Sequence, residues 1–122
     1  AGSPVYDLMS LLEDARREVD PMLAAHMLAR YLAAFPDMDH EALGASYAIL
    51  GAQRHAKVIG IFTRLSHRDG KSQYLPHIPH VWNMLERALA HPAMADVKTW
   101  IDAAIPQESR IVPAPSQPEA AA

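Results

Sequence analysis

A long stretch of the chain places apolar residues at intervals of three or four, and a cation interrupts the series. The seven positions are Leu43, Tyr47, Leu50, Arg54, Val58, Ile61 and Leu65. This spacing puts all seven side chains on one face of a single helix. A guanidinium on a face that is meant for burial needs an anion or several hydrogen-bond acceptors, because burying it alone costs several kcal/mol. The sequence therefore predicts a buried helical face with a partner for Arg54.

Three kinds of partner for Arg54 fit the sequence. One is a structural ion pair with a carboxylate of the first helix, and the candidates are Asp7, Glu13 and Asp14. The others are a part of a larger protein and an anionic ligand. Lys57 follows one helical turn later, and Gln53 precedes Arg54. Polar residues that flank an apolar stripe are more often solvated than bound to a ligand, since long cationic side chains extend readily to water.

Start and stop signals divide the chain into about five helices. Asp20 before Pro21 is a strong start signal, with Asp as the cap and Pro in the first turn, and Asp39 is a second cap. The residue before Pro36 disfavours helical geometry and ends the second helix. The expected helices span residues 6–18, 21–34, 40–67, 79–90 and 94–105. The pattern predicts an all-α bundle.

The periodicity also predicts the inward residues of the other helices. These are Leu8, Leu11, Leu12 and Ala15; Leu23, Met27, Leu28, Tyr31 and Leu32; Val81, Trp82, Leu85 and Leu89; and Val97, Trp100, Ile101 and Ala104. Gly51 and Gly60 lie inside the long helix, where each costs about 1 kcal/mol relative to Ala. We expect both glycines to allow close packing of another helix.

Length and composition favour one helical domain followed by a tail. A chain of 122 residues, of which 50% are hydrophobic, has room for a single core. We assign residues 1–106 to this domain. The segment after Pro106 is rich in Pro and Ala and offers little to bury, so residues 107–122 are expected to be a disordered tail.

Several classes of function are disfavoured by the composition. A formal net charge of −3 argues against a nucleic-acid partner. The chain contains no apolar run of about 18 residues, so no membrane contact is expected. Cysteine is absent, which fits a cytoplasmic protein. His77 and His80 are close in sequence, but two prolines interrupt their segment and no carboxylate completes a ligand set, so we expect no metal site.

Three segments resemble one family. The sequence QRHAKVIGIFTRLSHRDGK, residues 53–71, resembles a signature near the C-terminus of kinases of the aminoglycoside phosphotransferase and choline kinase superfamily. Within it, the most similar group is the bacterial anomeric kinases of N-acetylmuramate and N-acetylglucosamine in peptidoglycan recycling. Residues 3–19 resemble the segment after their magnesium-binding motif, and residues 74–92 resemble their penultimate helix. The resemblance runs from about residue 2 to residue 106 and implies the C-terminal helical subdomain of a protein-kinase-like fold.

The resemblance implies an ATP- and Mg²⁺-dependent parent enzyme whose chemical machinery lies outside this sequence. Kinases of this family need a nucleotide lobe, a catalytic loop of the HGD…N type and a following acidic residue for the metal. Residues 67–69 spell HRD, but no Asn follows within five residues, so we interpret them as a helix end. The chain is expected to hold no cofactor, to act as the substrate-side part beside an N-terminal kinase lobe, and to be inactive alone.

The resemblance also assigns roles to residues. Arg54, with Lys57 and Gln53, would contact the acceptor, and the lactyl carboxylate of N-acetylmuramate is a natural partner for a guanidinium. Asp7 would brace the catalytic loop through backbone hydrogen bonds, and it should face solvent where that loop is absent. No residue of the chain is assigned a catalytic role.

Two alternatives remain open at this point. An aminoglycoside or choline as the acceptor would keep the kinase class and change the substrate. A non-catalytic helical module would instead bind a protein partner or self-associate through exposed apolar surface.

Overall fold

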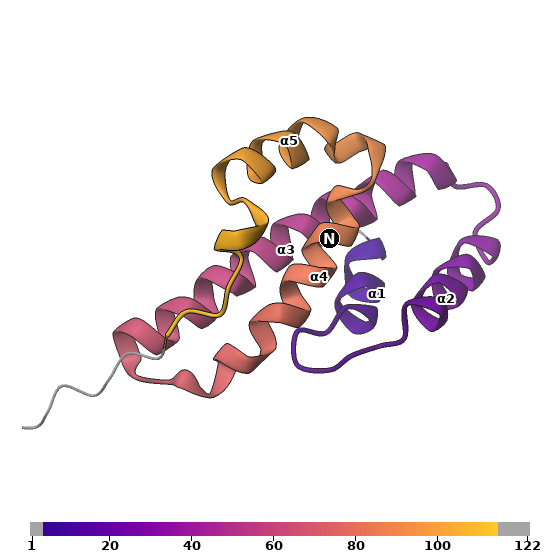
Figure 1. Ribbon diagram of the computed structural model, residues 1–122. Coiled ribbons are helices and arrows are strands. Elements are labelled where there is room, and N and C mark those ends of the chain that lie inside the picture. Colours follow the sequence, from indigo (N-terminus) through magenta and orange to yellow (C-terminus); the bar gives the residue numbers. More distant parts are fainter. Residues whose placement is uncertain (1–3, 115–122) are drawn as a thin grey trace, which may run out of the picture.

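The computed structural model describes residues 4–114, and within this range the chain forms five α-helices and three short 3₁₀ turns but no strand (Figure 1). The all-α prediction is confirmed. The α-helices are α1 (Pro4–Leu12), α2 (Pro21–Ala33), α3 (His40–Asp69), α4 (Ile78–Leu89) and α5 (Ala95–Ala104). The 3₁₀ turns are η1 (Ser72–His77), η2 (Pro92–Met94) and η3 (Gln107–Ser109). None of the helices in residues 4–114 has the length and apolar character needed to cross a membrane.

The 30-residue helix α3 is the scaffold of the molecule, and α4 runs antiparallel beside it (Figure 1). Helix α3 begins at the predicted cap, where the Asp39 carboxylate accepts a hydrogen bond of 3.1 Å from the backbone N–H of Ala42. It ends at Gly70, whose φ of 66° lies in the left-handed region that favours glycine. Both ends are therefore encoded locally, by a capping carboxylate and by a residue without a Cβ.

The core lies mainly between α3 and α4 and has two clusters of buried residues. The first contains Ala15, Phe62, Leu75, Ile78, Val81 and Met84. The second contains Ala48, Ala52, Leu85, Leu89 and Met94. The half-buried Trp82 packs against both clusters, as the sequence predicts for this residue. Most of the predicted inward residues of α4 are thus confirmed, since its apolar positions recur with a clear helical period.

The buried face of α3 differs from the predicted stripe. The fully buried residues of this helix are Ala48, Gly51, Ala52, His55, Phe62 and Ser66. The predicted stripe is its neighbour on the helix surface: six of its residues are half-buried, and Ile61 is exposed. Small residues at 48, 51 and 52 let α4 and α1 approach most closely there. Of the two neighbouring residues, His55 is therefore buried and Arg54 is only half-buried.

The first helix is shorter than predicted, and its predicted inward residues are confirmed in part: Leu12 and Ala15 are buried. It ends at Leu12, and the Asp14 side chain then accepts a hydrogen bond of 2.8 Å from the backbone N–H of Arg16. Such a bond stabilises a turn in place of another helical turn. Val5 and Met9 are completely buried, whereas Leu11, predicted inward, is 62% exposed.

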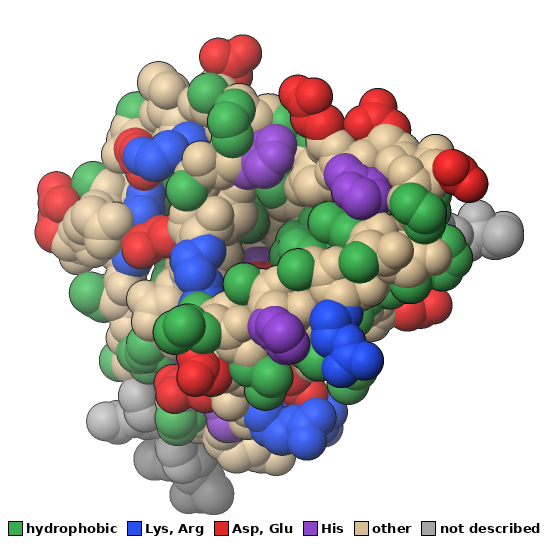
Figure 2. Space-filling model, turned by 90° about the vertical axis from the view of Figure 1, so that its right-hand side faces the viewer, with side chains coloured by type: hydrophobic (Ala, Val, Ile, Leu, Met, Phe, Trp, Pro, Cys, Tyr) green, Lys and Arg blue, Asp and Glu red, His purple; other side chains and the backbone are tan. Residues whose placement is uncertain are grey.

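The second helix begins at the predicted cap but does not join the core. The Asp20 carboxylate accepts a hydrogen bond of 3.0 Å from the Met22 N–H, which confirms the start signal. No residue of α2 is fully buried, and Leu23 and Met27, both predicted inward, are exposed. Figure 2 looks at the molecule from this side and shows a hollow flanked by hydrophobic side chains. Helix α2 thus has an apolar face, as its periodicity predicts, but few residues of the other helices cover that face.

The last helix also buries less than predicted. Trp100 is 68% exposed and Val97 is exposed, so the prediction that both belong to the core is wrong. Ile101 does pack against the second cluster. The exposed residues arise because α5 lies over the edge of the α3–α4 pair, where only one side of the helix meets other residues.

Part of the segment assigned to the tail packs on α4. Residues 107–109 form η3, and the side chain of Arg110 is only 4% exposed. The Arg110 guanidinium donates to Glu86 at 2.9 Å and to Asp102 at 2.7 Å, and it stacks over the Trp82 ring at 5.2 Å. The domain therefore continues beyond residue 106, and residues 115–122 of the predicted tail lie outside the described residues.

Candidate functional site

One pocket brings together all three residues that the sequence assigns to acceptor binding. Gln53, Arg54 and Lys57 of α3 line it, and α1 contributes Tyr6, which the sequence analysis missed. Leu50, Val58 and Ile61 complete the lining, and the pocket volume is about 330 Å³. The three polar residues meet because positions 53, 54 and 57 lie within one helical turn of one another.

Arg54 is held by an aromatic residue and not by a carboxylate. Its Nη1 donates a hydrogen bond of 3.1 Å to the Tyr6 hydroxyl, and its Cζ lies 5.9 Å from the Tyr6 ring centroid. Such a stack is favourable for a cation. Within residues 4–114, Arg54 takes part in no ion pair. The structural ion pair considered above is therefore absent from the described part of the chain.

None of the three proposed carboxylate partners forms an ion pair with Arg54 in residues 4–114, although Asp14 lines a neighbouring pocket together with Arg54. Glu13 faces His55, with Glu13 Oε1 and His55 Nε2 separated by 3.3 Å. Asp14 lies 3.7 Å from Arg17 and forms its pairs at the start of the connection to α2. Asp7 is exposed in the first turn of α1, where the helix dipole favours a carboxylate. Its role as a brace of a catalytic loop stays a prediction.

The pocket carries positive charge without a matching carboxylate in its lining. Arg54 and Lys57 supply two cations, and the other lining residues are neutral or apolar. The pKa of the Tyr6 hydroxyl is lowered because Arg54 donates a hydrogen bond to it and places a positive charge beside it; Ser10 and Lys57 contribute less. An environment that favours phenolate over phenol also favours a bound anion.

A second polar cluster, which the sequence analysis did not identify, lies in the interior beside α1. His55 is 1% exposed, and its partner Glu13 has 11% of its side chain exposed. Tyr47 is adjacent, and its pKa is raised by burial and by the neighbouring Glu13 carboxylate. The signal for this cluster was the series of small residues at 48, 51 and 52, which continues along the same helical face to His55.

Gly51 lies directly against this interior cluster. A Cβ at position 51 would lie 3.7 Å from Glu13 Oε2 and 3.8 Å from Met9 Cγ, so α1 packs directly on this glycine. The predicted close packing is thus confirmed for Gly51. It is wrong for Gly60, which is exposed and whose Cβ would meet nothing within 4 Å.

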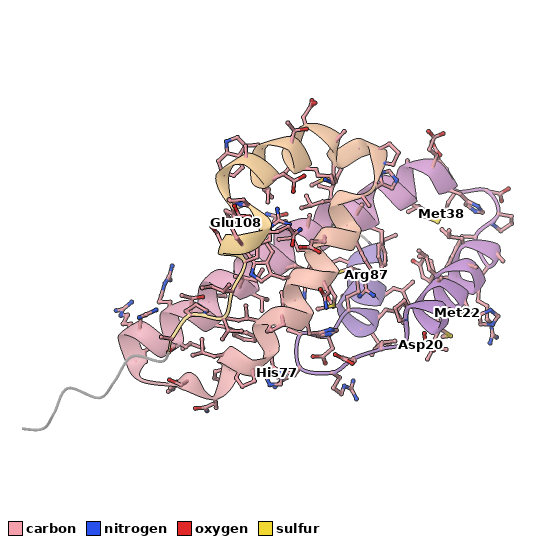
Figure 3. All side chains as sticks on the ribbon, in the orientation of Figure 1. Asp20, Met22, Met38, His77, Arg87 and Glu108 are labelled. Atoms are coloured by element: carbon pink, nitrogen blue, oxygen red, sulfur yellow. The ribbon has the colours of Figure 1, made fainter. Side chains whose placement is uncertain are left out.

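An apolar pocket of about 310 Å³ lies next to the same cluster, between α2 and the rest of the molecule. Glu13 and Tyr47 form part of its polar lining, and Arg87 reaches it from α4. Figure 3 shows the Arg87 side chain directed from α4 toward α2. The walls are otherwise mostly small aliphatic residues of α2, α3 and α4.

The histidines near the start of α4 have structural neighbours. His80 Nε2 lies 3.0 Å from the carbonyl oxygens of both Asp14 and Arg17, which fastens the connection between α1 and α2 to α4. The His77 ring is tilted against the Phe62 ring at 6.3 Å. Across the described residues, no group of three or more His, Cys, Asp or Glu side chains is arranged to hold a metal ion.

Comparison with known proteins identifies relatives of one kind. No protein-family model matches the chain. An N-acetylmuramate/N-acetylglucosamine kinase of Caulobacter vibrioides is 47% identical over 107 residues, which are 88% of this chain and 30% of the relative. The enzyme of the same name from Neisseria meningitidis serogroup B is 40% identical over 88 residues, covering 67% of this chain and 26% of the relative. A third, from Pseudomonas putida, is 32% identical over 103 residues, covering 79% of this chain and 30% of the relative.

The chain spans less than a third of the length of these curated relatives. The matched part includes most of α1 to α5, since 107 of 122 residues align with the Caulobacter protein. The predicted resemblance is therefore confirmed, and the chain is related along most of its length to bacterial N-acetylmuramate/N-acetylglucosamine kinases.

Proposed function

We propose that this chain is the C-terminal, substrate-side part of an ATP-dependent kinase that phosphorylates N-acetylmuramate and N-acetylglucosamine. The observation that carries the proposal is the 47% identity over 107 residues with a kinase named for these two sugars. A second observation supports the sugar side of the reaction: Gln53, Arg54 and Lys57, assigned to the acceptor from the sequence, line one pocket.

In the proposed reaction, the γ-phosphoryl group of ATP passes to the anomeric hydroxyl of the sugar, and ADP and a sugar 1-phosphate are released. Residues outside this sequence would bind ATP and Mg²⁺ and orient the hydroxyl. The pocket of α1 and α3 would form one wall of the acceptor site. Asp7, exposed at the start of α1, would hydrogen-bond to the backbone of the catalytic loop. The proposed enzyme would act in the cytoplasm, where ATP is available, in the recycling of cell-wall sugars.

The test compares the complete protein with the chain of residues 1–122. Each is assayed for ATP-dependent phosphorylation of N-acetylmuramate and of N-acetylglucosamine, with sugar 1-phosphate as the product measured. The complete protein is expected to phosphorylate both sugars, and the 122-residue chain neither. Phosphorylation of choline or an aminoglycoside in place of the sugars would contradict the proposed acceptor. Activity of the 122-residue chain alone would contradict its assignment as the substrate-side part.

A further inference from the structure

We propose that Tyr6 and Arg54 form a carboxylate-recognition site that distinguishes N-acetylmuramate from N-acetylglucosamine, with Tyr6 as the residue that positions the guanidinium. The inference rests on the proposed function and refines it. The two sugars differ by a lactyl ether, which gives N-acetylmuramate a carboxylate that N-acetylglucosamine lacks. A single site for that carboxylate would therefore set the preference of the enzyme between them.

The first argument is the unused hydrogen-bonding capacity of Arg54. A guanidinium has five N–H donors and no acceptor. In residues 4–114, one donor of Arg54 is used, by the bond of 3.1 Å to the Tyr6 hydroxyl. The side chain is half-buried and lines an open pocket. Its remaining donors are suited to a carboxylate, which can accept two of them in parallel.

The second argument is the charge of the pocket. Lys57 lies one turn after Arg54 and lines the same pocket, and no carboxylate belongs to the lining. The nearby Asp14, which shares a neighbouring pocket with Arg54, is paired with Arg16 and Arg17. Two cations without a counter-charge in the lining attract an anion and disfavour a cationic acceptor. This positive charge strengthens the binding of a sugar that carries a carboxylate, and it does not strengthen the binding of a neutral sugar. The charge pattern therefore favours N-acetylmuramate over N-acetylglucosamine.

The third argument is that Tyr6 holds the guanidinium from a second helix. Its ring lies beneath Arg54 at 5.9 Å, and its hydroxyl accepts the hydrogen bond. Tyr6 is placed by α1, which Val5 and Met9 anchor in the core on either side of it. The orientation of Arg54 thus depends on the packing of α1 on α3. Removing the Tyr6 hydroxyl should loosen the guanidinium without changing the charge of the pocket.

The test measures kcat and KM of the complete protein for both sugars. The variants are Arg54→Met, Tyr6→Phe and, as the matched control, Arg64→Met, because Arg64 is an exposed arginine of α3 that does not line the pocket. Arg54→Met should lower kcat/KM for N-acetylmuramate by about tenfold or more, the loss expected for a charge-assisted hydrogen bond. The loss should be in KM. The kcat/KM for N-acetylglucosamine should change by less than about threefold.

The preference of the enzyme is the kcat/KM for N-acetylmuramate divided by the kcat/KM for N-acetylglucosamine. Tyr6→Phe should lower this ratio by a smaller factor than Arg54→Met does, about threefold. The control Arg64→Met should leave the ratio unchanged. Thermal unfolding of each variant shows whether the fold persists. Equal losses for both sugars in Arg54→Met would overturn the proposal, since Arg54 would then support the catalytic part rather than read the carboxylate.

A direct binding measurement separates failure of this inference from failure of the proposed function. Calorimetric titration of the complete protein with each sugar, without ATP, should show that Arg54→Met weakens binding of N-acetylmuramate only. If neither sugar is phosphorylated but this selective loss is observed, the kinase proposal fails and the carboxylate site stands. If binding of N-acetylmuramate is unaffected by Arg54→Met, the carboxylate site is refuted whatever the activity.

Discussion

Arg54 and His55 are neighbours in the sequence, yet they face opposite surroundings. Arg54 lines an open pocket beside the phenol of Tyr6, whereas His55 is 1% exposed and faces the Glu13 carboxylate. Successive residues of an α-helix point about 100° apart, so one step along α3 leads from solvent to core. The comparison shows that the buried face of α3 is the face on which the neighbouring helices come closest. They come closest here because the residues at 48, 51 and 52 are small.

The largest expected effect concerns the interior face. Replacing Glu13 by Ala, or His55 by Leu, removes one partner of a largely buried polar pair. Each variant should lose about 3 kcal/mol of unfolding free energy, measured by urea denaturation of the chain. The exposed Glu18 provides a control, since Glu18→Ala should change stability by less than about 0.5 kcal/mol.

The double variant sharpens this comparison. Replacing Glu13 and His55 together by leucine removes both polar groups at once, so the combined loss should be clearly smaller than the sum of the single losses. Additive losses would show that the two side chains do not interact, contrary to their separation of 3.3 Å.

A second, smaller effect compares the two glycines of α3. Leu at position 51 would push into α1, where Met9 and Glu13 lie within 4 Å of a Cβ, and should cost about 2 kcal/mol. Leu at position 60 meets open space and should stabilise the helix by up to about 1 kcal/mol. Urea denaturation of Gly51→Leu and Gly60→Leu tests the difference. The same sign for both variants would contradict the assignment of one glycine to the packed face and one to the open face.

The smallest effect concerns the titration of Tyr6 on the open face. Its pKa should lie below the ordinary value of about 10, and Arg54→Met should return it toward that value, because both the hydrogen bond and the charge are then lost. The difference in phenolate absorbance between the chain and its Tyr6→Phe variant isolates this residue from the other tyrosines. An unchanged pKa in Arg54→Met would show that the contact is absent in solution.

The same shift has a consequence for stability whose sign follows from linkage. The folded state favours ionised Tyr6, so its contribution is fully present above the unfolded pKa of about 10 and is lost as the pH falls through the lower, folded pKa. The stability of the chain relative to Tyr6→Phe should therefore increase as the pH is raised toward about 10.

Much of the fold was predictable from local signals. Asp20 and Asp39 mark helix starts through backbone chemistry that needs no tertiary partner, and both positions are helix caps in the structure. The apolar period of α4 was also clear enough to predict most of its buried face. Signals of this kind survive because each is decided within a few residues.

The errors arose where burial depends on the partner helix. Trp100 and Leu23 fit an apolar period, but the rest of the molecule offers α5 and α2 too little surface to bury these side chains. The buried face of α3 differs from the predicted stripe because the neighbouring helices pack on its small residues and not on its large apolar ones. In the candidate site, Gln53, Arg54 and Lys57 could be grouped by spacing alone. Tyr6 could not, because its contact with Arg54 joins positions 48 residues apart.

Because α3 is one long helix, the positions of Arg54 and His55 are mechanically coupled. Its 30 residues span about 45 Å as one rod, so the helix can turn about its axis only as a whole. A turn that drew His55 out of the core would swing Arg54 away from Tyr6 by the same angle. A side chain larger than that of alanine at position 51 would press on Met9 and Glu13, next to the helix that also carries Tyr6. The angular setting of the positively charged pocket is therefore fixed by steric contacts on the other side of the same helix.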